Sequence, residues 1–413
     1  PSYLHQLPTG GETGTYLAMD LGASVIHVAC VSFFGSGLYE VEQVQRAIPD
    51  AIKRSDADTF FAFLAEVVIE ALREAGGLFL SSMHLGVTWS FRLDQNSLDD
   101  GTLVHWSKEF SVSGVEGKDV VYLLQKALDK KGLGIKVISI VNDTVSTLVA
   151  GAYSISADSI VDAPCLASCV MGTGTNAAYL ERTARVAAPA SSYRSFAIAT
   201  PSAFFSPFSP AYHQAPSFFP QTPLSYSIPS TPVGRGSRAF ENMVGAANLG
   251  RIVGRILVSL ISSGELLCRV AEALPHIPVA LTVDDLIAIE SDTTEKLTDV
   301  GRVLSHSLRL DPSRIRVVDR TLVQSITRLV SGRAARLYAA AIAALSVITA
   351  HAYHAVTIAV DGLLFRHYPA FDARVQEALA ELLGVEAAAG IYLVSADEAT
   401  GCVGAALVAL LSA

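Results

Sequence analysis

The sequence predicts an α/β protein built from two domains. Its 413 residues suffice for two domains that each bury a core. The β-branched run Ile135–Val141 predicts a buried strand, and it ends in Asn142 and Asp143. An apolar helix begins at Thr144, and a second apolar segment runs into the glycine-rich turn Gly172–Thr175. Polar residues at the carboxyl ends of strands are where open α/β sheets place their chemistry.

Composition narrows the functional classes. The formal net charge of -9 disfavours nucleic acid as a partner, because phosphate binding needs a concentrated basic face. The five cysteines are scattered and odd in number, so we expect no disulfide framework and a reducing, cytoplasmic setting. The most apolar segment, residues 337–350, is shorter than the ~20 residues that a membrane span needs and predicts a buried helix. We expect no signal peptide, and no internal repeat is visible.

The first third of the chain predicts a hairpin and two helices. A strand over residues 15–22 ends in an acidic glycine turn, and residues 25–33 supply the returning strand. A helix is predicted over residues 55–77, where acidic residues open an amphipathic stretch and a glycine closes it. Apolar residues at helical spacing predict a second helix over residues 120–132.

Small residues in two turns permit a phosphate group to approach the main chain. The first turn is Asp20–Gly22. In the second, two glycines allow a tight turn, and Thr173 and Thr175 offer hydroxyls and amides to a phosphate. The alternatives are a plain hairpin at the first turn and an ordinary glycine-rich β-turn at the second.

Several motifs in a fixed order resemble the hexokinase family of sugar kinases. Residues 106–110 and 113–120 resemble that family's sugar-site loop and the helix after it, and Asn142-Asp143-Thr144 resembles its catalytic strand end. Residues 170–179 resemble its second phosphate hairpin, and residues 360–371 its adenosine-side segment. The resemblance runs from about Pro8 to the C-terminus, with one break between Arg182 and Ala239.

The resemblance implies a two-lobed actin-like ATPase (ribonuclease H-like) fold with a central cleft between the lobes. It divides the chain into an N-terminal region, residues 1–181, and a C-terminal region, residues 182–413. The small lobe would take residues 14–141 and the large lobe residues 142–399, while residues 400–413 would return to the small lobe.

The resemblance also implies roles for particular residues. Asp143 would act as the base that takes a proton from the sugar, with Lys108 beside it. Ser107, Lys108 and Asn142 would position a hexose, and Asp20 would orient Mg²⁺ through water. The residues expected to bind ATP are Asp20, Gly22, Ser24, Gly172, Thr173, Gly174, Thr175, Asn176, Asp361, Gly362, Thr400 and Gly401. The alternative for Asp143 is a helix N-cap, which is a common place for Asp.

The chain departs from the family pattern at the first hairpin. Where the family has Gly-Gly-Thr-Asn-x-Arg, this chain has Gly-Ala-Ser-Val-Ile-His from Gly22 to His27. Val25 and His27 thereby remove an amide contact and a permanent cation. We expect a weakened but detectable affinity for Mg-ATP.

The sugar site departs further. Asp94 stands at the position assigned to a family Ser, and Arg251 at the position assigned to a family Glu. From Arg182 to Phe240 there is no Asp or Glu, and prolines exclude a regular helix or a central strand. This segment is either a long loop or the product of a reading-frame error. We therefore expect a weakly active or non-catalytic, regulatory protein that acts by binding a protein partner. The alternative is an active ATP-dependent hexokinase that phosphorylates the 6-hydroxyl of glucose or another hexose.

Overall fold

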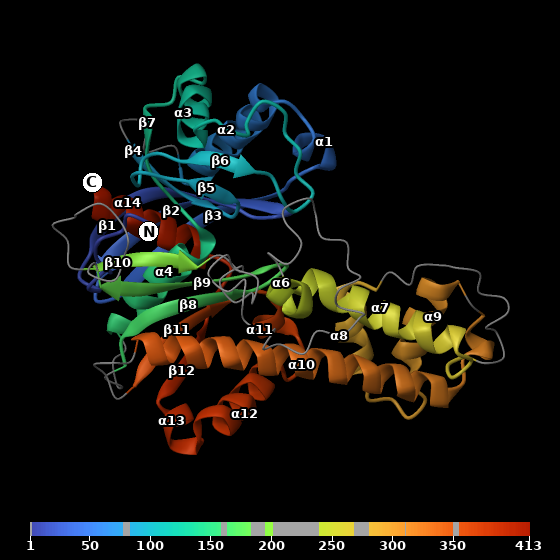
Figure 1. The fold of residues 1–413 in the computed structure, drawn as a ribbon. Helices are drawn as coiled ribbons and strands as arrows, with labels where there is room; N and C mark the ends of the chain where they lie inside the picture. The colour runs from blue at the N-terminus through green and yellow to red at the C-terminus, as the bar shows by residue number, and fades with distance from the viewer. Residues whose placement is uncertain are drawn as a thin grey trace, which may run out of the picture.

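The computed structural model describes residues 2–76, 83–157, 163–182, 195–200, 239–267, 281–309, 311–349 and 355–413 (Figure 1). Most of the acid-free segment 182–240 lies outside the described residues. Within that segment the structure has one strand, β10 (Ser195–Thr200), which contains no proline and forms the edge of a sheet. The expectation of a loop throughout the segment was therefore wrong for these six residues.

The first sheet has the strand order β3-β2-β1-β4-β7. Its strands are β1 (Thr13–Leu21), β2 (Val25–Gly35), β3 (Leu38–Ala47), β4 (Met83–Trp89) and β7 (Ile135–Val141). The pairs β1–β2 and β2–β3 are antiparallel, whereas β1–β4 and β4–β7 are parallel. The predicted hairpin and the predicted buried strand are both confirmed.

Helices and a short second sheet cover this first sheet. They are α1 (Asp50–Lys53), α2 (Ala57–Glu74), α3 (Val120–Lys130) and the antiparallel pair β5 (Arg92–Asp94) and β6 (Thr102–His105). Helix α2 starts where the sequence predicts, because the Asp56 carboxylate accepts a hydrogen bond from the Thr59 amide at 2.9 Å. Helix α3 is capped in the same way by Asp119, and Gly132 follows it with a φ of +70°.

The second large sheet repeats the topology of the first. Its order is β10-β9-β8-β11-β12, with β8 (Cys165–Met171), β9 (Thr175–Arg182), β11 (Val356–Asp361) and β12 (Ile391–Ser395). Again two antiparallel pairs lead into two parallel pairs. The fold thus contains a structural repeat that the sequence does not reveal, since the two sheets need only share a pattern of strand directions.

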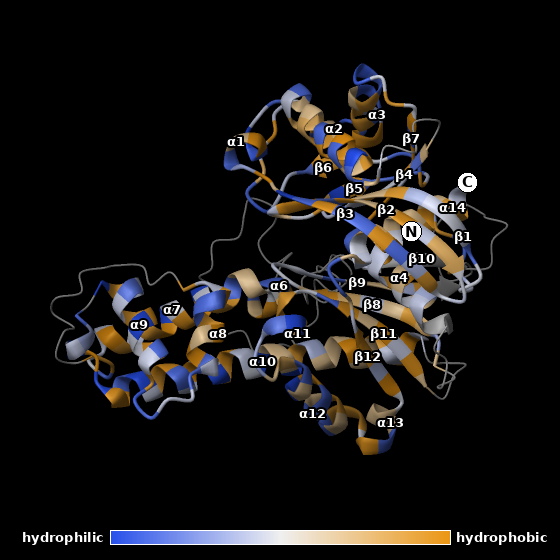
Figure 2. Ribbon diagram, turned by 180° about the vertical axis from the view of Figure 1, so that it is seen from behind, coloured by the Kyte–Doolittle hydropathy of each residue, from blue (hydrophilic) through white to orange (hydrophobic). Residues whose placement is uncertain are grey.

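The remaining helices belong to the second half of the chain. They are α6 (Ala239–Val244), α7 (Ala246–Ser262), α8 (Val283–Ser291), α9 (Thr298–Leu308), η5 (Pro312–Arg314), α10 (Val317–Thr349), α11 (Leu363–His367), α12 (Phe371–Leu383) and α13 (Val385–Ala389). Residues 337–349 of the predicted apolar helix form the end of the long helix α10, beside the second sheet, whereas α7, α8 and α9 lie along its first half (Figure 1). These outer helices mix hydrophilic and hydrophobic residues (Figure 2). In the described part of the chain, every helix is too short or too polar to cross a membrane.

Two helices form a layer between the sheets. Helix α4 (Asp143–Ala157) and helix α14 (Thr400–Ser412) share a core with residues of both sheets. Glycines make their close packing possible: a Cβ on Gly86 would lie 2.0 Å from the Ala405 carbonyl oxygen, and one on Gly404 would lie 2.2 Å from that of Ser146. Helix α14 packs on β1, β4 and α4. On this basis we propose that residues 14–141 and 400–413 form the small lobe and residues 142–399 the large lobe.

Candidate active site

Three carboxylates meet where strands of the two sheets end. Asp20 lies near the end of β1, Asp143 is the second residue after β7, and Asp361 ends β11. Because β1, β4 and β7 are parallel, their carboxyl ends share one edge of the first sheet. Burial and the charges of Asp143 and Asp361 raise the pKa of Asp20 to about 7. The two sheets therefore contribute acidic groups to a single site.

Asn142, rather than Asp143, caps helix α4. Its Oδ1 accepts hydrogen bonds from the Thr144 amide at 3.2 Å, the Thr144 hydroxyl at 2.7 Å and Asn176 Nδ2 at 2.8 Å. Asp143 is the first helical residue, and its Oδ1 accepts from the Thr144 amide at 2.8 Å. Its Oδ2 lies 4.0 Å from Lys108 Nζ, and both side chains remain about one-fifth exposed, at 22% and 23%. The N-cap alternative therefore does not account for Asp143.

The loop that carries Lys108 has an unusual backbone. Lys108 and Glu109 have φ values of +55° and +68°, in the left-handed region that non-glycine residues rarely occupy. Trp106 holds the loop from both sides: its amide donates to Glu116 Oε1 at 2.7 Å, and its indole Nε1 donates to the Val112 carbonyl at 2.9 Å. The side chain of Ser107, a predicted sugar contact, is partly buried in this loop.

The second predicted phosphate turn is held by neighbouring helices. The Gly172 amide donates to the Gly174 carbonyl at 3.1 Å, and the Gly172 carbonyl accepts from the Ala246 amide at the start of α7 at 3.0 Å. The Thr175 amide donates to Glu241 Oε2 at 3.3 Å. Together with the bond from Asn176 to Asn142, these contacts place residues 172–176 beside the start of α4.

The first predicted phosphate turn is held by main-chain hydrogen bonds. The Gly22 amide donates to the Val25 carbonyl at 3.0 Å, and the Ser24 carbonyl accepts from the Ile48 amide at 2.8 Å. His27 Nε2 is buried and has no hydrogen-bond partner among the described residues, and burial lowers the pKa of this imidazole. The turn is tight, as predicted, whereas contact of Ser24 with a nucleotide stays a prediction.

The predicted nucleotide residues near the C-terminus also adjoin the acidic site. A Cβ on Gly401 would lie 2.1 Å from Asp20 Oδ2, so the start of α14 lies directly against that carboxylate. Gly362 has a φ of +114°, and its Cβ would lie 2.4 Å from the Met171 carbonyl. Burial raises the pKa of Asp361, although Arg366 pairs with it at 3.1 Å. Thr400 bonds within its own turn, where its hydroxyl donates to Asp397 Oδ1 at 2.8 Å.

Two residues that the sequence analysis treated as defects lie at the surface. Asp94 is exposed at the end of β5, and Arg251 is exposed on α7. Among the described residues, neither makes a hydrogen bond or an ion pair with Lys108 or Asp143. By contrast, Glu241 contacts the second turn and was not assigned a role. The signal for it was its position as the first acidic residue after the acid-free segment.

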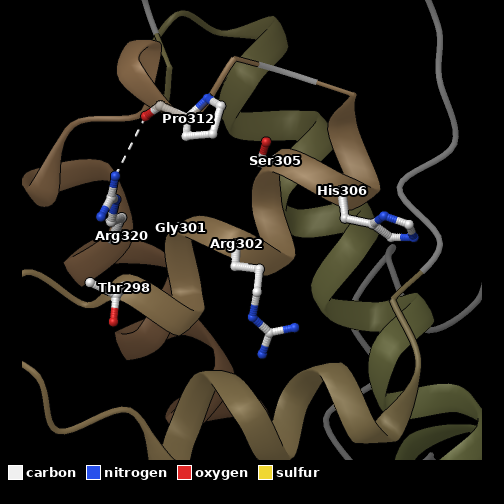
Figure 3. Close-up of a pocket in the computed structure, with 7 residues that line it drawn as sticks. All are labelled: Thr298, Gly301, Arg302, Ser305, His306, Pro312 and Arg320. Atoms are coloured by element: carbon white, nitrogen blue, oxygen red, sulfur yellow. Dashed lines mark hydrogen bonds between the residues drawn. The ribbon is translucent and has the colours of Figure 1, made fainter.

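Two surface pockets are formed by described residues. One, of about 500 Å³, lies on the outer helices and is lined by Thr298, Gly301, Arg302, Ser305, His306, Pro312 and Arg320 (Figure 3). There the Arg320 guanidinium donates to main-chain carbonyls and Arg302 pairs with Asp299 at 3.2 Å, so both cations have partners within the protein. The other, of about 610 Å³, adjoins the acidic site through Arg366 and is lined by Phe365, Arg366, His367, Asp372, Ser395, Ala396, Asp397 and Glu398.

Two sheets of the same topology, with acidic strand ends and a shared helix layer, define the actin-like ATPase fold. The fold predicted from the sequence is thereby confirmed. The structure is similar to the hexokinase from Schistosoma mansoni complexed with glucose, with a TM-score of 0.84 and 29% identity over 99% of this chain and 88% of that one. A ROK family glucokinase from Streptomyces griseus, at 14% identity and a TM-score of 0.50, shares the fold.

Sequence comparison gives the family. Hexokinase family models match residues 1–153 and 166–411. Hexokinase-1 of Oryza sativa subsp. japonica is 34% identical over 99% of this chain and 81% of its own length. Glucokinase-1 of Saccharomyces cerevisiae is 32% identical over 100% of this chain and 87% of its own length. The chain belongs to the hexokinase family.

Proposed function

We propose that this protein is an ATP-dependent hexose kinase that transfers a phosphoryl group to the 6-hydroxyl of a hexose. The proposal rests on the observation that the Asp143 carboxylate is not used as a helix cap. Asn142 performs the helix-capping role, so the Asp143 carboxylate remains partly exposed beside Lys108. A carboxylate in this position can take the proton from an attacking hydroxyl, and a nearby ammonium can hold the sugar and balance charge.

The sugar hydroxyls would be held by both hydrogen-bond donors and hydrogen-bond acceptors. Lys108 and the Ser107 hydroxyl supply donors, and Asn142 supplies an amide. Glu241 adds a carboxylate next to Thr175 and Asn176, and a carboxylate can accept more than one hydrogen bond. We therefore add Glu241 to the residues predicted from sequence as a candidate acceptor for a sugar hydroxyl.

The nucleotide would lie along the second sheet. Residues 172–176 present amides and threonine hydroxyls to its phosphates, and the pocket at Arg366 adjoins Asp361 on the side predicted for adenosine. Thr400 and Gly401, at the start of α14, would also contact the nucleotide.

The acidic groups fit the Mg²⁺ that the family implies. Asp20 and Asp361 lie close enough for the charge of one to raise the pKa of the other, which is an arrangement that a divalent cation stabilises. No three acidic, His or Cys side chains in the described ranges could by themselves bind a metal ion, so Asp20 would hold Mg²⁺ through water. Bound there with ATP, the ion would neutralise charge on the transferred phosphoryl group.

The pairing of a partly exposed Asp143 with Lys108 favours this function over the weakly active or regulatory protein expected from sequence. That expectation rested on three departures. Two of them, Asp94 and Arg251, are exposed, and among the described residues neither forms an ion pair with Lys108 or Asp143. The third, segment 182–240, lies mostly outside the described residues. We therefore propose catalysis.

A coupled assay with glucose, fructose and mannose at saturating Mg-ATP tests the proposal. We expect turnover within the usual range of roughly 1–10³ s⁻¹. Asp143→Asn should lower kcat by about 10²- to 10⁴-fold, the usual contribution of a general base. Asp94→Asn and Arg251→Ala serve as controls and should leave kcat within about twofold. Thermal shifts with glucose and with Mg-ATP, in the absence of turnover with all three sugars, would contradict the proposal and favour a non-catalytic binding protein.

A further inference from the structure

An aromatic cluster lies beneath the loop that carries Lys108. It consists of Phe60, Phe61, Trp89, Phe91, Trp106 and Phe110, with centroids of neighbouring rings 4.9 to 6.5 Å apart. Phe91 packs edge-on against both Trp106 and Phe110 at 4.9 Å. Because these two rings belong to the loop itself, the cluster fixes where the loop lies relative to the first sheet.

Phe91 also contacts the catalytic lysine. Lys108 Nζ lies 5.6 Å from the centroid of the Phe91 ring, within the ~6 Å range of cation–π attraction. The same ammonium is 4.0 Å from Asp143 Oδ2. Phe91 is only 4% exposed, so its ring is a fixed surface against which the ammonium lies.

The backbone of Lys108 makes such a support necessary. Lys108 and Glu109 are both in the left-handed region, and residues in strained conformations persist only where their surroundings hold them. A lysine side chain also has many rotamers, so it samples other positions unless a contact selects one. Ion pairing at 4.0 Å to a partly exposed carboxylate is a weak restraint by itself.

We propose that Phe91 is a positioning residue for the reaction: its ring holds the Lys108 ammonium beside Asp143. The proposal rests on the hexose kinase function proposed above and adds a residue that acts through Lys108. It implies that removing the ring lowers kcat even where the fold and the affinity for ATP are retained.

Phe91→Leu and Phe61→Leu make a matched pair. Phe61 is a buried ring of the same cluster, 2% exposed and stacked on Trp89, but it belongs to α2 and has no contact with Lys108. Both variants should lose similar thermal stability, because each deletes a buried ring. Only Phe91→Leu should lower kcat, by about three- to thirtyfold, with KM for ATP unchanged.

A double-mutant cycle separates positioning from general destabilisation. If Phe91 acts through Lys108, then Phe91→Leu should cause little further loss of kcat in a Lys108→Met background. Equal losses in both backgrounds, or a loss of kcat in Phe61→Leu as large as in Phe91→Leu, would overturn the proposal.

A second readout does not depend on turnover. Reductive ¹³C-methylation keeps the lysine charge, and the Lys108 signal is identified by its absence in Lys108→Arg. A ring beneath the ammonium should shift that signal upfield, and the shift should disappear in Phe91→Leu and persist in Phe61→Leu. An inactive wild-type protein that shows this shift would contradict the hexose kinase function but not the contact. A Lys108 signal that is the same in wild type and Phe91→Leu would overturn the contact, whatever the activity.

Discussion

The two halves of the site differ in how completely the protein satisfies their polar groups. In the first half, on the first sheet, Asp20 has a raised pKa, Lys108 and Glu109 have left-handed backbones, and His27 Nε2 has no hydrogen-bond partner among the described residues. In the second half, amides and carbonyls of residues 172–176 bond to one another, to Glu241 and to the start of α7. The first half therefore carries backbone strain and an imidazole nitrogen that is unpaired within the described part of the chain. In the second half the turn is braced by hydrogen bonds, and the nearby Asp361 carboxylate is paired with Arg366 at 3.1 Å.

This difference indicates what ligands would do in each half. Buried like charges and strained backbone cost free energy in the free protein, and a cation or a sugar hydroxyl that contacts them lowers that cost. A turn whose hydrogen bonds are already made needs no rearrangement to receive a phosphate. We expect ligand binding to change the dynamics of the first half more than those of the second.

The largest expected effect is on the free energy of unfolding, and it tests which contacts hold the second half of the site in place. Gly362→Ala should lower the free energy of unfolding by about 3–5 kcal/mol, because a Cβ would lie 2.4 Å from the Met171 carbonyl on a backbone with a φ of +114°. Gly172→Ala is the control, since its nearest contact would be an ordinary 3.6 Å, and we expect a change below about 1 kcal/mol. Urea denaturation measures both, and equal losses would show that the turn is not held at Gly362.

The next effect concerns the charge of the first half. In the absence of Mg²⁺ and ATP, Asp20→Asn should stabilise the protein at pH 8. The rise of the pKa of Asp20 from 3.8 to about 7 corresponds to at most about 4 kcal/mol, and partial exposure of the side chain lowers the expected gain to ~1–3 kcal/mol. The same variant should lose Mg²⁺-dependent activity, because it removes the predicted metal-orienting carboxylate.

The pH dependence gives the sign of this effect. A raised pKa in the folded state means that the folded protein binds the Asp20 proton more tightly than the unfolded chain does. Wild type should therefore lose stability relative to Asp20→Asn as pH rises from about 4 to about 7, with no further divergence above that range. Parallel unfolding free energies of the two proteins between pH 4 and 8 would show that Asp20 is not perturbed.

A smaller effect tests the strain in the first half. Glu109→Gly should raise stability by up to about 1 kcal/mol, because glycine adopts a φ of +68° without steric cost but loses more entropy on folding. Ser36→Gly, at a φ of +52° in the turn between β2 and β3, is the matched control away from the site and should gain a similar amount. Only Glu109→Gly should also lower kcat, since it loosens the backbone of Lys108. Unchanged kcat would mean that this strain has no part in catalysis.

The sequence predicted the parts of the fold and site that depend on local pattern. The strand before Asn142, the cap of α2 and the turn at Gly172 all rest on residues near one another in the chain, and the structure confirms each. The repeated sheet topology and the packing of α14 depend on contacts between distant segments. Local pattern does not predict such contacts, and only the family resemblance implied that residues 400–413 return to the small lobe.

The residues around the proposed sugar site also depend on contacts between distant segments. Which way Arg251 faces depends on how α7 packs, and the sequence analysis assigned its side chain by register alone. Glu241 was overlooked because its contact with Thr175 joins residues 66 positions apart. The role of Asp143 as a base, by contrast, rests on the resemblance and on the exposed carboxylate, and it stays a prediction until the assay is done.

The smallest expected effect concerns Tyr338, a polar side chain near the second half of the site whose hydroxyl is less well satisfied than the groups of the turn. The Tyr338 hydroxyl of α10 is buried beside the Thr175 side chain but forms no hydrogen bond of good geometry with a described residue. Burial raises the pKa of this phenol, and the contact with Thr175 lowers it. Removing a poorly bonded buried hydroxyl loses little, so Tyr338→Phe should leave stability unchanged or raise it by up to ~1 kcal/mol. Tyr153→Phe should instead lose about 1 kcal/mol, because the Tyr153 hydroxyl lies 3.0 Å from the Leu38 carbonyl. Thermal unfolding of the two variants measures the difference. An equal loss in both would show that Tyr338 is bonded in solution, and its hydroxyl would then be as well satisfied as the groups of the turn.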